Sequence, residues 1–200
     1  MLEQITPKIV NHQIEKGILQ ESDRNIYQYG YQMLMEFGIN ILTSIVIAIL
    51  FQAFEIVIVF TIAYLMMRGY AGGYHAKTSV GCFGMSAGIL ILSILAVQKL
   101  TELAMAWWIL LVIEVVMMPV IFIGTPIPVK NKPITNNEYL HFKKKVKQIY
   151  CIELVIIMIL FWCDKPVYAF SIMATQAVIF VMTGIDIFSR VIQKRLKKSN

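Results

Sequence analysis

The sequence predicts an all-α, polytopic integral membrane protein with about six transmembrane or partly inserted helices and an N-terminal amphipathic helix at the interface. Of its 200 residues, 58% are hydrophobic and 15% are charged, and the mean hydropathy is +0.69. Soluble domains are roughly 45–50% apolar, so this composition is typical of a membrane protein. The first thirty or so residues are polar, which predicts that no signal peptide is removed. We expect a single membrane domain over residues 1–200.

The N-terminal region, residues 1–36, is expected to hold cytoplasmic and interfacial helices. In residues 2–20, apolar side chains recur at about helical spacing with charges between them, which predicts an amphipathic helix too polar to span. This helix would either pack on the bundle or dock a partner helix. Ser22 and Asp23 are residue types that cap helices, so we expect a second helix to begin there and to enter the membrane.

Apolar character runs over residues 37–67, with a polar interruption at Gln52–Glu55. At 1.5 Å per residue this run measures roughly 46 Å, which is too long for one upright span across a hydrocarbon core about 30 Å thick. We therefore expect two segments, at about 37–53 and 55–67. One steeply tilted helix is the alternative.

Four further apolar stretches complete the six predicted membrane segments. Several are shorter than the roughly 20 residues of a comfortable span, so partial insertion is expected. Residues 37–123 would hold the first four segments and residues 150–185 the last two, followed by a basic tail over 186–200. The four stretches are Phe83–Val97, Leu103–Ile123, Tyr150–Trp162 and Val167–Ile185.

The distribution of positive charge predicts the orientation. With both termini in the cytoplasm, sixteen of the 18 lysines and arginines lie inside, and only Lys99 and Lys165 lie outside. Positive residues accumulate on the cytoplasmic side of membrane proteins. This arrangement also places the polar stretch at residues 68–82 on the cytoplasmic side. Topology thus accounts for the net charge of +6, and no nucleic-acid partner is expected.

Residues 124–149 form a polar segment that is expected to be a cytoplasmic loop. The three prolines between residues 126 and 133 keep its first half extended. Thr135 and Glu138 have capping-box spacing, so a basic helix should begin there and continue into the fifth membrane segment. The lysines within residues 143–147 would contact lipid headgroups or dock an acidic peptide.

The stretch from Arg68 to Cys82 is the candidate functional site. It contains His75 and Cys82, each one of only three residues of its type in the chain, and four glycines. A cysteine beside a histidine supplies an activated thiolate nucleophile. In one continuous helix the two side chains would be about 10 Å apart along the axis. The backbone must therefore bend for them to meet, as Gly72 and Gly73 permit.

Cys82 would open the third membrane segment, where free amides at a helix N-terminus stabilise a thiolate and form an oxyanion hole. His75 would hold the proton, while Arg68 and Lys77 would steady negative charge or hold a substrate carboxylate. The alternative is that Cys82 is a small apolar filler at a membrane boundary. No CxxC or Cys/His zinc spacing occurs, so neither a disulfide framework, a metal nor a cofactor is expected.

Two motifs in the chain resemble those of the accessory gene regulator B (AgrB) family, bacterial quorum-sensing membrane endopeptidases. With the length and the amphipathic N-terminus, the resemblance covers nearly the whole chain. It implies that His75 and Cys82 are catalytic, and that Lys130, Lys132 and Pro133 support or bind the substrate together with the residues around His75. It also implies a homodimer. The motifs are Arg68-xxx-Gly72-Gly73-x-His75-x6-Cys82 and Pro126-Ile-Pro128-Val-Lys130-Asn131-Lys132-Pro133.

The resemblance further implies a reaction. The family removes the C-terminal tail of a short amphipathic precursor, an AgrD-like peptide, and the new C-terminus closes onto an internal Cys or Ser as a thiolactone or lactone. Cys82 would form the acyl-enzyme, and His75 would act first as base and then as acid. The expected partners are this precursor, membrane lipids and a second copy of the chain, in the bacterial cytoplasmic membrane.

Two other classes of function remain alternatives. A transporter or peptide-export channel would use polar residues inside the predicted spans, and a structural membrane subunit would have no reaction. Glu114, near the middle of the fourth segment, would otherwise be a protonated packing residue or would hydrogen-bond a neighbouring helix. The polar residues in spans are Thr43, Ser44, Glu114 and Gln176.

Overall fold

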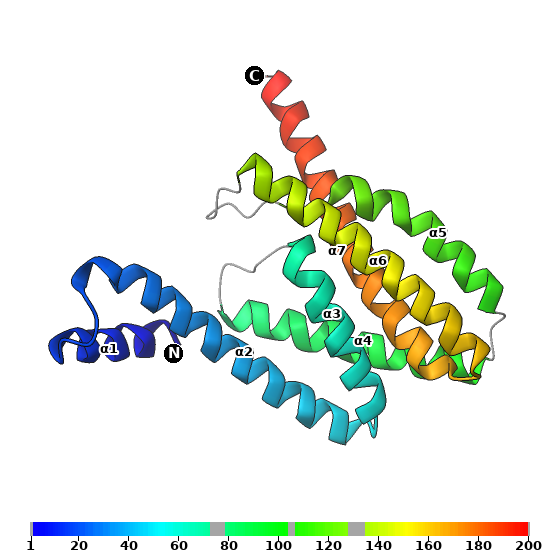
Figure 1. The fold of residues 1–200 in the computed structure, drawn as a ribbon, viewed down its shortest axis with the longest axis horizontal. Coiled ribbons are helices and arrows are strands. Elements are labelled where there is room, and N and C mark those ends of the chain that lie inside the picture. Colours follow the sequence, from blue (N-terminus) through cyan, green and yellow to red (C-terminus); the bar gives the residue numbers. More distant parts are fainter. Residues whose placement is uncertain (1, 73–78, 104–106, 128–134, 200) are drawn as a thin grey trace.

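The computed structural model is a bundle of helices joined by short connections (Figure 1), and it describes residues 2–72, 79–103, 107–127 and 135–199. Within these residues every helix and turn fits an all-α fold, which confirms the predicted fold class, and the β-structure consists of one isolated bridge. The described elements are α1 (Leu2–Glu15), a 3-10 turn (Glu21–Asp23), α2 (Arg24–Leu50), α3 (Phe54–Ala71), α4 (Ser79–Glu102), α5 (Trp107–Gly124), α6 (Asn136–Trp162) and α7 (Pro166–Ser199).

Among the described residues, four segments are helical, long and apolar enough to cross a membrane, which supports a membrane protein. They belong to α2, α3, α4 and α7. Helix α5 is apolar over a shorter stretch, Trp108–Gly124. Helix α6 combines a lysine-rich first half with an apolar second half. The count of about six membrane segments therefore stays a prediction for α5 and α6.

The chain turns between α2 and α3 where the sequence predicts it. Helix α2 ends at Leu50, Gln52 has a positive φ of 49°, and α3 begins at Phe54. The amide of Gln98 in α4 donates to the carbonyl of Phe51 at 3.4 Å, which fixes the turn against the bundle. Two segments are thus confirmed, and the single tilted helix is wrong.

The beginning of α2 differs from expectation. Asp23 occupies the N-cap position, but its backbone is helical (φ −96°, ψ −2°) and its side chain makes no capping hydrogen bond. A capping side chain needs extended backbone at that position to reach the next free amides. Instead the Ser22 hydroxyl donates to Asp23 Oδ1 at 3.3 Å, and Arg24 pairs with Glu21 across the turn.

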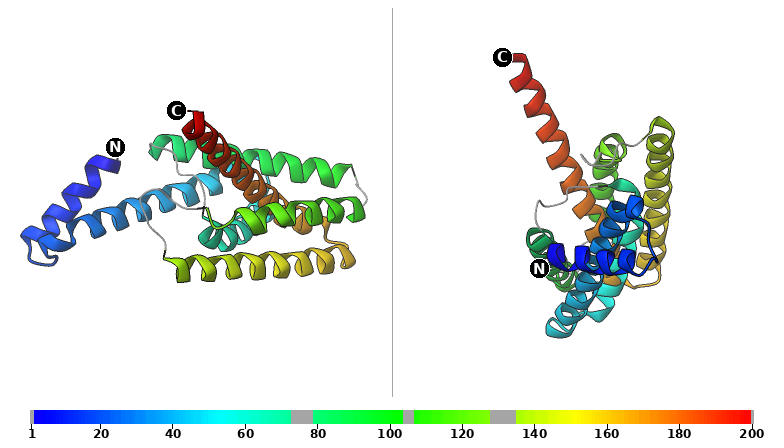
Figure 2. Two further views of the ribbon diagram at one scale, coloured as in Figure 1. Left: turned by 90° about the horizontal axis from the view of Figure 1, so that it is seen from above. Right: turned by 90° about the vertical axis from the view of Figure 1, so that its left-hand side faces the viewer.

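Helix α1 and the first half of α2 form an arm that extends away from the other helices (Figures 1 and 2). The two helices run side by side, with Thr6 and Val10 fully buried between them. Gln13 donates to the hydroxyl of Tyr31 at 2.8 Å. Helix α1 thus packs on α2, and the expected amphipathic helix at the membrane interface stays a prediction.

Helix α7 lies at the centre of the bundle and packs against α3, α4, α5 and α6. Two apolar clusters flank it: one surrounds Ile94 and Phe170, and the other surrounds Met67 and Ile121. Successive helices from α2 to α7 alternate in direction (Figures 1 and 2). The helix connections consequently gather at two opposite ends.

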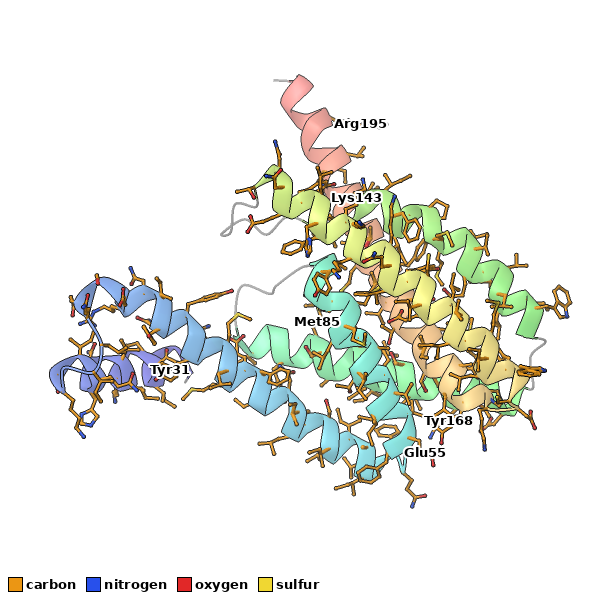
Figure 3. All side chains as sticks on the ribbon, viewed as in Figure 1. Tyr31, Glu55, Met85, Lys143, Tyr168 and Arg195 are labelled. Carbon is orange, nitrogen blue, oxygen red and sulfur yellow. The ribbon has the colours of Figure 1, made fainter. Side chains whose placement is uncertain are left out.

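The two ends differ in charge. One end holds the α2–α3 turn with Glu55, the Lys99–Glu102 ion pair and Lys165. The other holds the end of α3, the start of α4 and the lysine-rich start of α6, and we call it the basic end. Figure 3 shows Lys143 at the basic end, and Glu55 with Tyr168 at the opposite one. The helices alternate in direction, as the orientation inferred from the lysines and arginines requires. That the basic end faces the cytoplasm stays a prediction.

Polar residues inside the bundle are paired between helices. The Tyr150 hydroxyl of α6 contacts Glu114 of α5, at 3.0 Å from Oε2 and 2.7 Å from the backbone carbonyl. Gln176 of α7 donates to Glu153 of α6 at 3.0 Å. All four side chains are buried. Polar side chains that hydrogen-bond across helices stabilise packing in membranes, so the helix–helix hydrogen bond expected for Glu114 is present.

The α5–α7 contact at the basic end predicts a stability effect. A Cβ on Gly124 would lie 2.1 Å from Cγ2 of Thr183, whose hydroxyl is bonded to Ile179. Gly124→Ala should therefore cost about 1–3 kcal/mol through overpacking. The matched control is Gly184→Ala in α7, where no atom lies within 4 Å. Thermal unfolding in detergent should show a lower midpoint for the first variant only, and equal midpoints would contradict the close contact.

Candidate functional site

Helix α3 ends at the candidate site because the backbone changes conformation at Gly72. Its φ of +69° and ψ of −157° lie in a region that residues with a Cβ avoid. The Gly72 amide still bonds the carbonyl of Arg68 at 3.2 Å, so the helix closes normally before the chain leaves it. The chain thus leaves α3 at Gly72, and the bend expected between His75 and Cys82 stays a prediction.

Gly72 also forms the one bridge between the two sequence motifs in the described residues. The amide of Ile127 donates to the carbonyl of Ala71 at 2.8 Å, in a parallel bridge between Gly72 and Ile127. A Cβ on Gly72 would lie 2.6 Å from the Ile127 carbonyl oxygen. Only glycine therefore permits this approach. The start of the proline-containing loop is held directly against the end of α3.

The side chain of Arg68 also holds the backbone at the end of α3. Its Nη1 donates to the Gly72 carbonyl at 2.7 Å and contacts the sulfur of Met182 in α7 at 3.4 Å. A cation in the last turn of a helix also suits the negative end of the helix dipole. These contacts show Arg68 as a support of the site's backbone. Its expected role toward a substrate carboxylate stays a prediction.

Cys82 lies in the first turn of α4, which begins at Ser79. Cys82 was expected to open this helix, and the helix in fact begins three residues earlier, so that Cys82 is its fourth residue. The Cys82 side chain lies outside the described part of the structure, as do Gly73, His75 and Lys77 in residues 73–78. Lys130, Lys132 and Pro133 lie in residues 128–134, which are also outside it. The meeting of His75 with Cys82 therefore stays a prediction.

The connection that carries His75 is short and fixed at both ends. It comprises the six residues between Gly72 and Ser79. Gly72 is held by Arg68 and Ile127, and Ser79 begins a helix. Six residues span at most about 20 Å when fully extended. His75 belongs to these six residues, and its position relative to Cys82 stays a prediction.

A cavity of about 250 Å³ lies beside the first turns of α4, between α2, α3 and α4. Arg68 and Ser86 are among its lining residues, and Ser86 follows Cys82 by one helical turn. Sequence reasoning missed this cavity. Its polar wall on α2 had a detectable signal, because Glu36, Asn40 and Ser44 recur every four residues in an apolar region and so share one helix face.

The other expected candidates lie elsewhere. Cys151 and Cys163 are exposed free thiols on α6 and just after it. The predicted capping box is confirmed: the Thr135 amide donates to Glu138 at 2.9 Å and the Glu138 amide to Thr135 Oγ1 at 3.4 Å. Helix α6 begins at this capping box, and its lysines lie at the basic end. The Nζ atom of Lys147 lies 5.4 Å from the centroid of the Phe122 ring.

Comparison with known proteins identifies the family. The model of the family described as Accessory gene regulator B matches residues 2–189. A Clostridium perfringens (strain 13, type A) protein whose name describes it as AgrB-like is 27% identical over 173 residues, which cover 81% of this chain and 79% of the relative. A second AgrB-like protein, from C. perfringens strain SM101, is 26% identical over 171 residues, covering 81% and 79%. No solved structure matches the chain.

The family match extends over both motifs, over the arm formed by α1 and α2, and over nearly all of the helical bundle. It therefore covers far more than the short stretches from which the resemblance was recognised. The chain belongs to the accessory gene regulator B (AgrB) family.

Proposed function

We propose that this AgrB-family protein is a membrane cysteine endopeptidase that removes the C-terminal tail of a small amphipathic precursor of the AgrD type. Family membership places the chain in quorum-sensing peptide processing. The observation that supports the finer proposal is the position of Cys82 in the first turn of α4, seven residues after His75 in the sequence. A helix N-terminus lowers the pKa of a cysteine thiol and favours the nucleophilic thiolate.

In the proposed reaction, His75 takes the thiol proton and the Cys82 thiolate attacks the scissile carbonyl. The amides of the first turn of α4 stabilise the oxyanion. The amide bond then breaks, the proton passes from His75 to the amine of the departing tail, and the peptide remains on Cys82 as a thioester.

Ring closure follows by acyl transfer. An internal thiol or hydroxyl of the peptide attacks the thioester, a thiolactone or lactone forms, and the Cys82 thiol is regenerated with the transferred proton. Exchange of one thioester for another is close to neutral in energy, whereas amide to thioester is uphill. Removal of the tail or of the ring product must therefore drive the net reaction, and no nucleotide is consumed.

Five further residues are proposed to contact the substrate, and the protein is proposed to act as a dimer with its basic end in the cytoplasm. Gly73, Lys77, Lys130, Lys132 and Pro133 would shape the substrate side of the site, next to the Gly72–Ile127 bridge. The basic end would face the cytoplasm, where its lysines meet anionic lipid headgroups. The protein would act as a homodimer in the bacterial cell membrane.

The residues that suggested a transporter have other partners. Glu114 and Gln176 are buried and hydrogen-bonded to neighbouring helices, and Thr43 and Ser44 donate to carbonyls of their own helix at 2.8 Å. Packing accounts for Glu114 and Gln176 without a transport path. Within residues 2–72, 79–103, 107–127 and 135–199, no separate observation favours a channel.

The catalytic assignment predicts a loss of processing in two single variants. Cys82→Ala and His75→Ala should each lower precursor cleavage by at least about 1000-fold, because a nucleophile and its base act as one unit. Co-expression with the precursor gene and mass spectrometry of the peptide measure this. The matched controls, Cys151→Ala and Cys163→Ala, remove exposed thiols elsewhere and should process normally. Normal cleavage by membrane-inserted Cys82→Ala would contradict the assignment.

The contacts of Gly72 with Arg68 and Ile127, which we call the Gly72 corner, predict a loss of cleavage without any change in the catalytic side chains. Gly72→Ala must displace Ile127 and strains a positive φ, so the end of α3 should shift and cleavage should fall by about 100-fold. Gly69→Ala, one turn earlier in α3 with no atom within 4 Å of its Cβ position, should cleave at the normal rate. Equal activity of both variants would show that the bridge does not position the site.

A further inference from the structure

The cavity between α2, α3 and α4, which we call the α4 groove, has an apolar floor and a polar wall. Ile47, Phe60 and Leu90 form much of the floor and are buried. The wall carries amide, carboxylate and hydroxyl groups in the middle of apolar helices. Its polar members are Glu36, Asn40, Thr43, Ser44, Thr61 and Ser86.

Two hydroxyl groups in this wall have no partner among the described residues. Serine and threonine in helices commonly donate to the carbonyl four residues earlier. Thr43 and Ser44 do so, to Ile39 and Asn40. Thr61 of α3 and Ser86 of α4 make no hydrogen bond within the described part of the chain. The groove therefore presents the hydroxyls of partly buried Thr61 and exposed Ser86, from two different helices, as groups available to a ligand.

The groove begins on α4 at Ser86, one helical turn after the proposed catalytic position. Ser86 follows Cys82 by four residues, so the two positions lie on the same face of α4, one turn apart. Arg68, which holds the Gly72 carbonyl, lines the same space. A chain segment lying in the groove would thus end within about one helical turn of Cys82.

We propose that the α4 groove binds the precursor peptide as an extended segment next to its scissile bond, a proposal that rests on the proposed peptidase function. A peptidase must hold its substrate with the backbone open to attack. An extended backbone at membrane depth leaves N–H and C=O groups unpaired, and each needs a partner from the protein. The Thr61 and Ser86 hydroxyls supply such partners, while Phe60 and Leu90 receive apolar side chains.

The polar wall decides between this occupant and two others. A lipid acyl chain has no polar groups and would fit an apolar groove better. A helical peptide satisfies its own backbone and has no use for donors on the wall. An extended amphipathic peptide is the ligand that uses both surfaces, and peptides bound in extended form are commonly held through main-chain hydrogen bonds.

The kinetic test uses the double variant Thr61→Val/Ser86→Ala in purified protein reconstituted in vesicles, with synthetic precursor as substrate. Loss of two hydrogen bonds should raise KM about tenfold, with kcat changed less than twofold. The matched control is Thr101→Val at the far end of α4, outside the groove. Its hydroxyl already donates to the Val97 carbonyl of the same helix, so the KM of this variant should not change. An unchanged KM in the double variant would overturn the proposal.

A cross-linking test reports the occupant directly. A photoreactive benzoylphenylalanine replaces Ile89, which lines the groove, or Leu92, which is 69% exposed and does not line it. In the Cys82→Ala background the precursor should cross-link at position 89 at least fivefold more than at position 92. Equal cross-linking of the peptide at positions 89 and 92, or cross-linking to lipid alone at both, would overturn the proposal that the groove binds the precursor.

The two proposals fail in different ways. If Cys82→Ala abolishes cleavage but the groove variants change neither KM nor cross-linking, the peptidase function is supported and the substrate binds elsewhere. If Cys82→Ala cleaves normally, the peptidase proposal is wrong, and so is the groove proposal that rests on it.

Discussion

The structure depends on one constraint: inside a membrane, every backbone N–H and C=O needs a partner within the protein. The described chain meets it with helices almost throughout. The instructive place is the end of α3, where the chain stops being helical beside the candidate site. There the carbonyl of Ala71 accepts from Ile127, and the carbonyl of Gly72 accepts from Arg68. The chain leaves the helix only where other residues take over its hydrogen bonds.

This constraint makes one structural unit of two motifs that lie far apart in the sequence. Ile127 can reach Ala71 only because position 72 has no side chain. The proline-containing loop therefore completes the end of α3, and Arg68 joins both to α7 through Met182. Catalytic groups need positions fixed to within about 0.5 Å, which rigid elements supply better than free loops. The Gly72 corner gives such a fixed starting point to the connection that carries His75.

The sequence predicted what local patterns determine and missed what depends on tertiary contacts. Apolar length and the polar break at Gln52–Glu55 were enough for α2, α3 and their turn, and the spacing of Thr135 and Glu138 was enough for the capping box. The helix begins after Asp23 as expected, but the expected capping bond was wrong because capping depends on the backbone conformation at Asp23, which residue type does not set. The Gly72–Ile127 bridge and the α4 groove unite segments from different helices, so no single stretch of sequence reveals them.

A groove that holds the acyl part of the substrate would also bear on the fate of the thioester. Two nucleophiles compete for that intermediate: water, which gives a linear peptide, and the internal thiol or hydroxyl, which gives the ring. Holding reacting groups together is worth an effective concentration of about 10⁵ M or more when the geometry is right. The apolar floor at Phe60 and Leu90 excludes water from one side of the bound segment. Substrate binding in the groove and ring formation at Cys82 would then be two consequences of the same enclosed surface.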